Sequence, residues 1–483
     1  MKLAAEKLAA VTDRRYMCVM KDFELILRGG VVVTPEGVSV SDIGIAEGNI
    51  VALGKELSGE ASEEIDARGV HIFPGVIDAH VHFNEPGRAE WEGIETGSQA
   101  LAAGGGTMFF DMPLNAHPPT CDVDSFDLKA AAASANSLTD FGLWGGLVPH
   151  NLEQLERLAE RGVVGFKAFM SDSGIDDFPR ANHGTLRKGM KRAAGVGALV
   201  AVHAESESIT QKLSQEKMSR GKMSARDYLD SRPIEAELEA IRNAIDMAGD
   251  VGCKLHVVHV SSAEGVELIT DAKKRGADVS CETCPHYLTL TENDMLKLGA
   301  VAKCAPPLRS PRERDALWER VIAGEVMTVG SDHSPSPPEM KQDTNFFKVW
   351  GGISGVQHLL SLLVGTGEAR EHFGWEPDGE TPALPGPALS LVAKLTSFNV
   401  AERFRLPKTK GRIEMGAEAD FALVDFREKF VVRAEDLFYR HKQSPYVGRA
   451  LTGRVVQTIL RGQTIFKRGQ IVGRQRGRLI KPL

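Results

Sequence analysis

The sequence predicts an α/β fold: a (β/α)₈ TIM-like barrel with a small flanking β domain built from both chain ends. Three observations support this prediction. Eight short apolar runs alternate with helix-like stretches through the middle of the chain, and period-two strand patterns occupy the two ends. Side chains that can bind metals stand within or near the ends of several of the runs, where such a barrel has its active site.

The composition is that of an ordinary globular protein with room for one large domain and a smaller one. The chain has 483 residues, of which 42% are hydrophobic and 25% are charged. Its formal net charge of −7 gives no support to a nucleic-acid or membrane-surface partner. No apolar run approaches the roughly 20 residues that span a bilayer. Six cysteines are few for a chain of this length, so we expect no disulfide framework and a cytoplasmic location.

Residues 1–21 are expected to be a dispensable N-terminal extension. They mix basic and acidic residues and lack the continuous apolar core and cleavage site of a secretory signal. Met17 and Met20 offer later starts just before a strand-like run that begins at Phe23. A targeting role is the alternative for this stretch.

Strand-like alternation occupies two separate segments, residues 22–72 and 404–483. Both ends of the chain share this character and the middle lacks it. We therefore expect the two segments to pair into one β domain beside a barrel formed by residues 73–403.

The middle of the chain shows eight apolar runs, each followed by a stretch with helical spacing of its apolar residues. The runs are residues 75–83, 106–113, 141–148, 163–170, 198–205, 254–261, 278–286 and 326–334. Eight β-then-α units indicate a closed barrel. A doubly wound open sheet is the alternative, but no glycine-rich phosphate-binding turn follows the first run.

A His-x-His pair lies on the first run, at His80 and His82. Alternate residues of a strand point to the same face, so both imidazoles can approach one ion above the barrel mouth. Such a pair alone is a weak signal. Four further potential ligands occupy later runs: Lys167, His203, His259 and Asp332. It is improbable that all six positions fall within or near barrel strand ends by chance.

Lys167 is the unusual member of this set, because an ammonium group cannot bind a cation. A buried lysine has a depressed pKa, however, and a neutral amine can add carbon dioxide. The resulting carbamate has two oxygen atoms and could bridge two metal ions. The set as a whole suits zinc, and also cobalt, manganese or iron. The alternative is a lysine paired with an acid inside the barrel.

These residues and their neighbours resemble the cyclic amidohydrolases, a family that includes dihydroorotases, dihydropyrimidinases (hydantoinases) and allantoinases. The motifs are His80-Val-His82, Gly-Phe-Lys167, Val-His203-Ala-Glu, Val-His259-Val-Ser and Ser-Asp332-His. The resemblance covers nearly the whole chain from about residue 22. It implies a pair of divalent ions in each subunit. One ion would be bound by His80, His82 and Asp332 and the other by His203 and His259, with a carboxylated Lys167 and a hydroxide bridging the two.

Other stretches are similar to the allantoinase branch of that family. They are FNEPGRAEWEG (83–93), CETCPHYL (281–288), KCAPPLR (303–309), SDHSPSPPEMK (331–341), KVWGGISG (348–355) and YRHKQSPYVGR (439–449). Dihydroorotases usually have an arginine two residues after the second histidine, where it binds the substrate carboxylate, and this chain has Asn84 there. Dihydropyrimidinases usually have a tyrosine shortly after the lysine, and here none follows Lys167. The group that stabilises the oxyanion is therefore left open.

The resemblance implies a hydrolase that opens the ring of allantoin to give allantoate, with Asp332 as the catalytic proton carrier. The residues that could hold the substrate are Asn84, Asn115, Ser171, Asp172, Ala305, Gly351 and Gly352. We expect a homo-oligomer, with a tetramer favoured. A hydantoinase or dihydroorotase activity is the nearer alternative. A non-enzymatic scaffold is the more distant one, because such relatives usually lose metal ligands.

Overall fold

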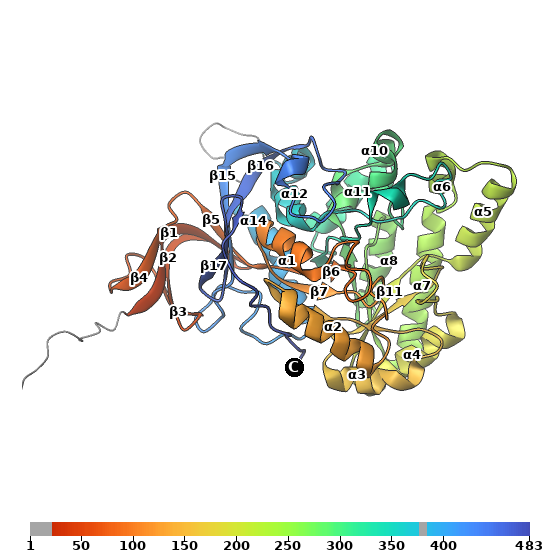
Figure 1. Cartoon of the computed structure of the whole chain (residues 1–483), viewed down its shortest axis with the longest axis horizontal. Coiled ribbons are helices and arrows are strands. Elements are labelled where there is room, and N and C mark those ends of the chain that lie inside the picture. The colour runs from red at the N-terminus through yellow and green to blue at the C-terminus, as the bar shows by residue number, and fades with distance from the viewer. Residues whose placement is uncertain (1–21, 376–383) are drawn as a thin grey trace, which may run out of the picture.

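The two ends of the chain form one nine-stranded sheet, which lies beside the barrel (Figure 1). The computed structural model describes residues 22–375 and 384–483, so the expected N-terminal extension lies outside the described residues. The strands of this sheet are β1 (Phe23–Thr34), β2 (Gly37–Ala46), β3 (Asn49–Gly54), β4 (Ala61–Asp66), β5 (His71–Pro74), β15 (Phe421–Val431), β16 (Ala450–Leu460), β17 (Gln463–Lys467) and β18 (Gln470–Ile471).

The strand order shows how the two ends combine. It runs β18-β17-β16-β15-β5-β1-β2-β3, and β4 pairs with β1. The junction is the antiparallel pair of β5 with β15, in which Ile72 lies opposite Leu423. An apolar cluster that includes Leu27, Ile43 and Ile459 fills one face of this sheet. Both chain ends therefore build one β domain, as predicted. The boundaries expected after residues 72 and 403 stay predictions.

The middle of the chain forms the predicted parallel barrel. Its strands are β6 (Val76–Val81), β7 (Gly106–Asp111), β8 (Asp140–Leu143) continued by β9 (Gly145–Gly146), β10 (Phe166–Phe169), β11 (Leu199–His203), β12 (Lys254–Val257), β13 (Val279–Thr283) and β14 (Thr328–Val329). With β8 and β9 counted together, one strand overlaps each of the eight predicted runs. A parallel bridge from Val81 to His333 joins β6 to the segment after β14, and this bridge closes the barrel.

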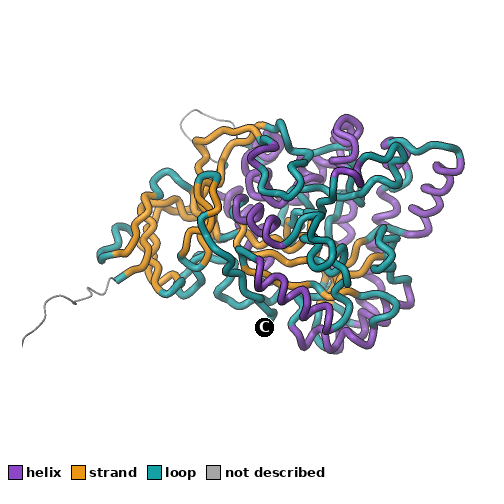
Figure 2. Tube along the Cα trace, viewed as in Figure 1, coloured by secondary structure: helices purple, strands orange, loops and turns teal. Residues whose placement is uncertain are grey.

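Helices cover the outside of the barrel, as Figure 2 shows. They are α1 (Ile94–Ala103), α2 (Val123–Asn136), α3 (Leu155–Arg161), α4 (His183–Gly195), α5 (Glu207–Ser219), α6 (Ala225–Asp230), α7 (Ile234–Val251), α8 (Ala263–Lys274), α9 (Pro285–Thr289), α10 (Glu292–Leu298), α11 (Pro311–Ile322), α12 (Leu359–Gly365), α13 (Gly367–His372), α14 (Gly386–Ala393) and α15 (Asn399–Arg403). In α7 the buried residues Leu238, Ile241 and Ala244 recur every third residue and form an inward face. Among the described helices, none has the length and apolar character needed to cross a membrane.

A buried ionic cluster ties the barrel, the β domain and the C-terminal tail together. The Lys410 ammonium lies 2.6 Å from Asp140 Oδ2 and 2.8 Å from Asp420 Oδ2. Arg461 also pairs with Asp140, and the backbone N–H of Arg478 donates to the same carboxylate. Burial opposes the charge of Lys410, but the surrounding carboxylates raise its pKa overall. The cluster therefore holds charged groups that depend on one another.

We expect Lys410→Met to destabilise the protein strongly. Removing one partner of a buried charge cluster leaves carboxylates without compensation, which costs about 3–5 kcal/mol of unfolding free energy. Urea denaturation of this variant and of Lys408→Met, a change at an exposed neighbouring lysine, measures the difference. Equal midpoints for the two variants would contradict the role of the cluster.

Candidate metal centre

The six predicted ligands converge at one end of the barrel. His80 lies in β6 and Lys167 in β10, while His203 ends β11. His82, His259 and Asp332 follow β6, β12 and β14 within three residues. The ring centroids of His80 and His259 are 5.4 Å apart, and those of His203 and His259 are 4.7 Å apart. Strands far apart in the sequence therefore present one cluster of imidazoles.

The first half of this cluster is formed by His80, His82 and Asp332. Asp332 Oδ1 lies 3.1 Å from His80 Nε2 and 3.4 Å from His82 Nε2. One donor atom from each residue lies within 4.8 Å of the other two. Two imidazole nitrogens and one carboxylate oxygen at this spacing can hold a divalent metal ion.

The second half is formed by His203 and His259. The Nδ1 atom of His203 lies 3.1 Å from Nε2 of His259. The other ring nitrogen of His203, Nε2, lies 2.8 Å from Glu205 Oε2. Glu205 therefore leaves Nδ1 of His203 free to face the nitrogen of His259, and the two nitrogens form a second donor pair.

Buried carboxylates orient two of the histidines from behind. Glu282 Oε1 lies 2.8 Å from His80 Nδ1, which leaves Nε2 of that ring for the centre. Glu205 plays the same part for His203 and is itself paired with Arg232. Carboxylates that hold metal-binding histidines fix the ring orientation and raise the basicity of the ligand. Glu282 lies in the CETCPHYL stretch, but no local sequence pattern predicted a role for it or for Arg232.

Lys167 lies among these groups without a partner. Its side chain is fully buried, and within the described residues its Nζ atom has no hydrogen-bond partner. The Nζ atom lies 5.1 Å from the centroid of the Phe169 ring. Burial lowers the pKa of Lys167 to about 8, against the opposing effect of Asp332 and Glu282. Burying an amine without a hydrogen-bond partner lowers the stability of the fold, so an amine in this position indicates a chemical role.

Strained backbone also marks this end of the barrel. His259 has φ of 41° and Asp332 has φ of 45°, while Asn84 and Asn115 both have φ of 65°. Non-glycine residues rarely adopt positive φ, and such strain concentrates at functional sites.

A cavity of about 350 Å³ opens above the cluster. Five of the seven residues predicted to hold a substrate line it: Asn115, Asp172, Ala305, Gly351 and Gly352. Asn84 and Ser171 are buried and are not among the lining residues. The cavity is large enough for a small polar molecule.

Two arginines near the mouth are already paired with carboxylates. Arg88 lies 3.0 Å from Asp177 and donates to the Asn115 carbonyl at 2.9 Å. Arg232 lines the cavity, but Glu205 compensates its charge. Neither guanidinium is therefore an uncompensated cation waiting for an anionic ligand.

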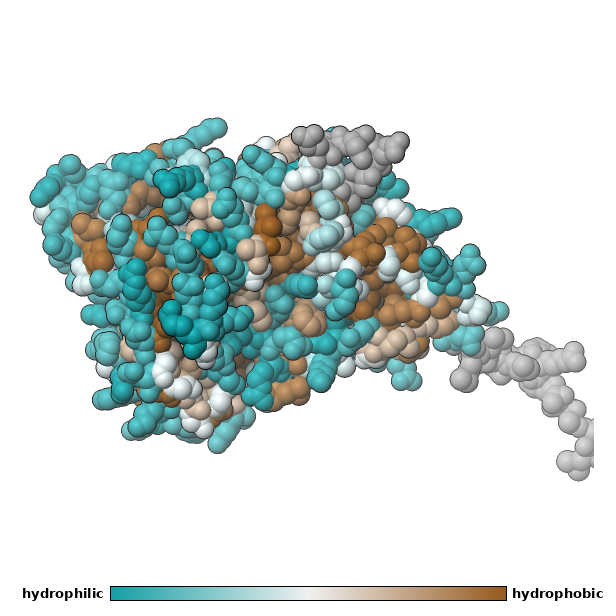
Figure 3. Space-filling model, turned by 180° about the vertical axis from the view of Figure 1, so that it is seen from behind, coloured by the Kyte–Doolittle hydropathy of each residue, from teal (hydrophilic) through white to brown (hydrophobic). Residues whose placement is uncertain are grey.

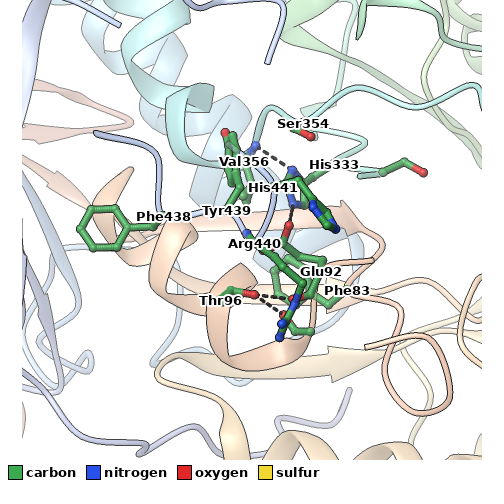
Figure 4. A network of polar contacts seen from close by, with 12 residues as sticks. Phe83, Glu92, Thr96, His333, Ser354, Val356, Phe438, Tyr439, Arg440 and His441 are labelled. Carbon is green, nitrogen blue, oxygen red and sulfur yellow. Dashed lines mark hydrogen bonds and ion pairs between the residues drawn. The ribbon is translucent and has the colours of Figure 1, made fainter. Parts of the chain in front are cut away.

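His333 points away from the cavity, as its position next to Asp332 predicts. Its Nδ1 accepts a hydrogen bond from the Gly355 N–H, and its Nε2 lies 3.7 Å from Glu92 Oε2 (Figure 4). Glu92 in turn accepts from the Arg440 backbone N–H at 3.1 Å. This network fixes the YRHKQSPYVGR stretch against the barrel rim behind Asp332, so it supports the site without entering it.

Comparison with known proteins places the chain among metal-dependent hydrolases. Residues 71–465 match the amidohydrolase family. A protein named allantoinase from Rubrobacter xylanophilus is 53% identical over 96% of this chain and 98% of its own length. A second protein of that name, from Deinococcus radiodurans, is 50% identical over 95% of this chain and 99% of its own length. The solved structure of an L-hydantoinase (dihydropyrimidinase) from Arthrobacter aurescens has a TM-score of 0.89 at 32% identity, covering 95% of this chain and all of that one.

We expect Glu282→Gln to weaken metal binding at the centre about 10–100-fold, since it removes the carboxylate that orients His80. Chelator competition followed by metal analysis measures this loss. Glu264→Gln, at an exposed position on α8, is the control. Chelator resistance equal to that of the control would show that Glu282 does not tune the site.

Proposed function

Because the chain belongs to the amidohydrolase family, we propose that it hydrolyses the cyclic amide ring of allantoin to give allantoate. The protein is a hydrolase of cyclic amides, as its family and its relatives named allantoinase indicate. The observation that carries the proposal is the meeting of two donor sets beside the unpaired amine of Lys167. A hydantoinase activity is the second candidate, because the hydantoinase structure shares the fold.

The donor atoms fit two divalent ions, and we favour zinc. His80, His82 and Asp332 would hold one ion, while His203 and His259 would hold the other. Lys167 would bridge them after its neutral amine adds carbon dioxide, which forms a carbamate and releases one proton. Two ions bound there would supply an activated water molecule and polarise the amide carbonyl. The unpaired Nζ atom supports this assignment, since the added carboxylate would supply one oxygen ligand for each ion.

Asp332 is suited to carry the proton of the reaction. Burial disfavours its charged form, but His80 and His82 hold its pKa well below the usual range. It therefore stands as a carboxylate at the site. It would take the proton from the attacking water and deliver it to the ring nitrogen that leaves, so the amide bond breaks without a free amide anion.

Backbone groups of the cavity wall match an amide substrate. Within residues 22–375 and 384–483, neither the N–H nor the carbonyl of Ala305 and Gly351 has a hydrogen-bond partner. Allantoin alternates N–H and C=O groups along its ring and its ureido arm. Unpaired backbone donors and acceptors would complement that pattern and would orient the scissile bond. Asn84, Asn115, Ser171, Asp172 and Gly352 remain predicted contacts.

Cellular context and assembly are also proposals. The five cysteines of the described chain are buried free thiols, which supports a reducing, cytoplasmic environment. Figure 3 shows apolar surface on the back face over the flanking β domain. Val40, Val51 and Leu53 of that domain are exposed. Exposed apolar surface of this kind supports a homo-oligomer, with a tetramer favoured.

Lys167→Ala should lose bound metal and nearly all activity. Without the carbamate, the two ions would face four neutral imidazoles and one carboxylate, which compensate little of their charge. Metal analysis and the intact mass of the wild-type protein, in which carboxylation adds one carbon dioxide, measure the effect. Short carboxylic acids should restore part of the metal and the activity. A variant that keeps two ions and normal turnover would remove the bridging role.

Substrate selection should exclude an anionic ring. With Asn84 in place of a carboxylate-binding arginine, and with Arg88 and Arg232 already paired, no guanidinium is available for the carboxylate of dihydroorotate. We expect its kcat/KM to be far below that of allantoin. A panel of allantoin, dihydroorotate, hydantoin and dihydrouracil on metal-analysed protein tests this. Equal kcat/KM values for allantoin and dihydroorotate would overturn the assignment.

A further inference from the structure

Two lysines with no part in the proposed chemistry lie at one wall of the cavity, and one of them, Lys303, is among its lining residues. Lys303 begins the KCAPPLR stretch, and Lys341 ends the SDHSPSPPEMK stretch. Both side chains reach toward residues 346–352, here called the strap. The strap includes most of another of these stretches, KVWGGISG (348–355). The strap contains no helix or strand, yet Val349, Gly351 and Gly352 line the cavity. Its shape must therefore be set by contacts other than a backbone ladder.

Lys303 binds the strap from within the wall. Its ammonium donates to the carbonyl of Phe346 at 2.7 Å and to that of Val349 at 2.5 Å. The same group lies 4.4 Å from the ring centroid of Tyr228, a favourable cation–π distance. The backbone carbonyl of Lys303 accepts from the Gly352 N–H at 2.8 Å, so one residue holds both ends of the strap.

Lys341 binds the same strap from its other side. Its ammonium donates to the carbonyls of Gly352 at 2.8 Å and Trp350 at 3.1 Å. A third bond, at 3.2 Å, reaches the carbonyl of Ala300 outside the strap. All three donors of the ammonium group are thereby used.

The two contact sets make hydrogen bonds from buried lysines the organising contacts of this wall. Burial lowers the pKa of Lys303 and that of Lys341 to about 7, so the contacts rest on their N–H donors more than on a full charge. In the described part of the chain, neither lysine forms an ion pair with a carboxylate. Lys303 faces carbonyl oxygens and the Tyr228 ring, and Lys341 faces carbonyl oxygens. Four strap carbonyls are held in this way. The carbonyls of Val349, Trp350 and Gly352 all turn toward an ammonium group, whereas that of Gly351 does not.

Gly351 is the residue that this arrangement leaves free for a ligand. Its neighbours Trp350 and Gly352 are both fixed by Lys341. At Gly352 a Cβ atom would lie 2.1 Å from the Ser334 carbonyl, so the strap passes close to the segment after Asp332. At Gly351 a Cβ atom would lie 3.8 Å from Lys303 Cε, an ordinary van der Waals distance, and Gly351 itself lines the cavity.

We propose that Lys303 and Lys341 are positioning residues for the substrate, forming a paired clamp that presets the strap so that the Gly351 peptide can bind an amide or ureido group. The substrate class rests on the proposed hydrolase function, but the clamp itself does not. In this proposal the two lysines act by holding the carbonyls of the strap.

Lys341→Met and Lys303→Met test the clamp, because methionine keeps most of the length of the side chain and removes its donors. Hydrogen exchange of the strap amides should become about 10-fold faster or more, since local order is lost. The KM for allantoin should rise about 10-fold, while kcat and metal content change less than about 3-fold. Lys341→Gln keeps an amide donor and should give intermediate values. Lys297→Met, at an exposed lysine of α10, is the control.

The outcomes separate the clamp from the proposed function. Wild-type exchange rates and KM in both methionine variants would overturn the clamp. If the glutamine variant lost metal, had a lower kcat and had a higher KM, all to a similar degree, the lysine would have a general structural role. That result would also overturn the clamp. A wild-type enzyme without activity on allantoin would refute the proposed substrate, and the exchange experiment would still decide whether the lysines order the strap.

Discussion

The closing of eight parallel strands into a barrel is the constraint on which the site depends. Parallel strands all end at the same rim, so a side chain at the end of any strand is directed to the same small volume. His203 and His259 come from adjacent strands, and the bridge between Val81 and His333 brings Asp332 beside His80. Because the closure of the barrel sets the distance between Asp332 and His80, a small shift at the Val81–His333 bridge would change the spacing of these ligand atoms.

Convergence alone would leave the imidazole rings free to turn, and buried carboxylates remove that freedom. Glu282 fixes His80 and Glu205 fixes His203, so each ring presents one chosen nitrogen. Burying carboxylates is costly unless they are paired, and the histidines and Arg232 provide the partners. The same groups that orient the donors are therefore stabilised by them.

The sequence predicted the parts of this structure that follow from local periodicity. Alternation placed His80 and His82 on one face, and the run-and-helix pattern located all eight strands. It did not reveal Glu282 or Arg232 as partners of the donors, because their contacts cross the barrel between segments far apart in the chain. The meeting of Lys303 with Lys341 depends on irregular loops, whose paths no periodicity encodes. The docking of the tail through Arg478 onto Asp140 likewise has no local pattern.

The buried lysines of this protein show three different solutions to one physical problem. Lys129 and Lys410 are paired with carboxylates, at 2.6 Å from Asp111 and from Asp140. Lys303 is surrounded instead by carbonyl oxygens and an aromatic ring. Lys167 is equally buried and has neither solution among the described residues. An unmodified ammonium group there would lack hydrogen-bond acceptors, and it would repel a metal ion bound by the neighbouring imidazoles. The proposed carboxylation would remove this conflict, since it would convert the buried amine of Lys167 into an anion beside the proposed pair of metal ions.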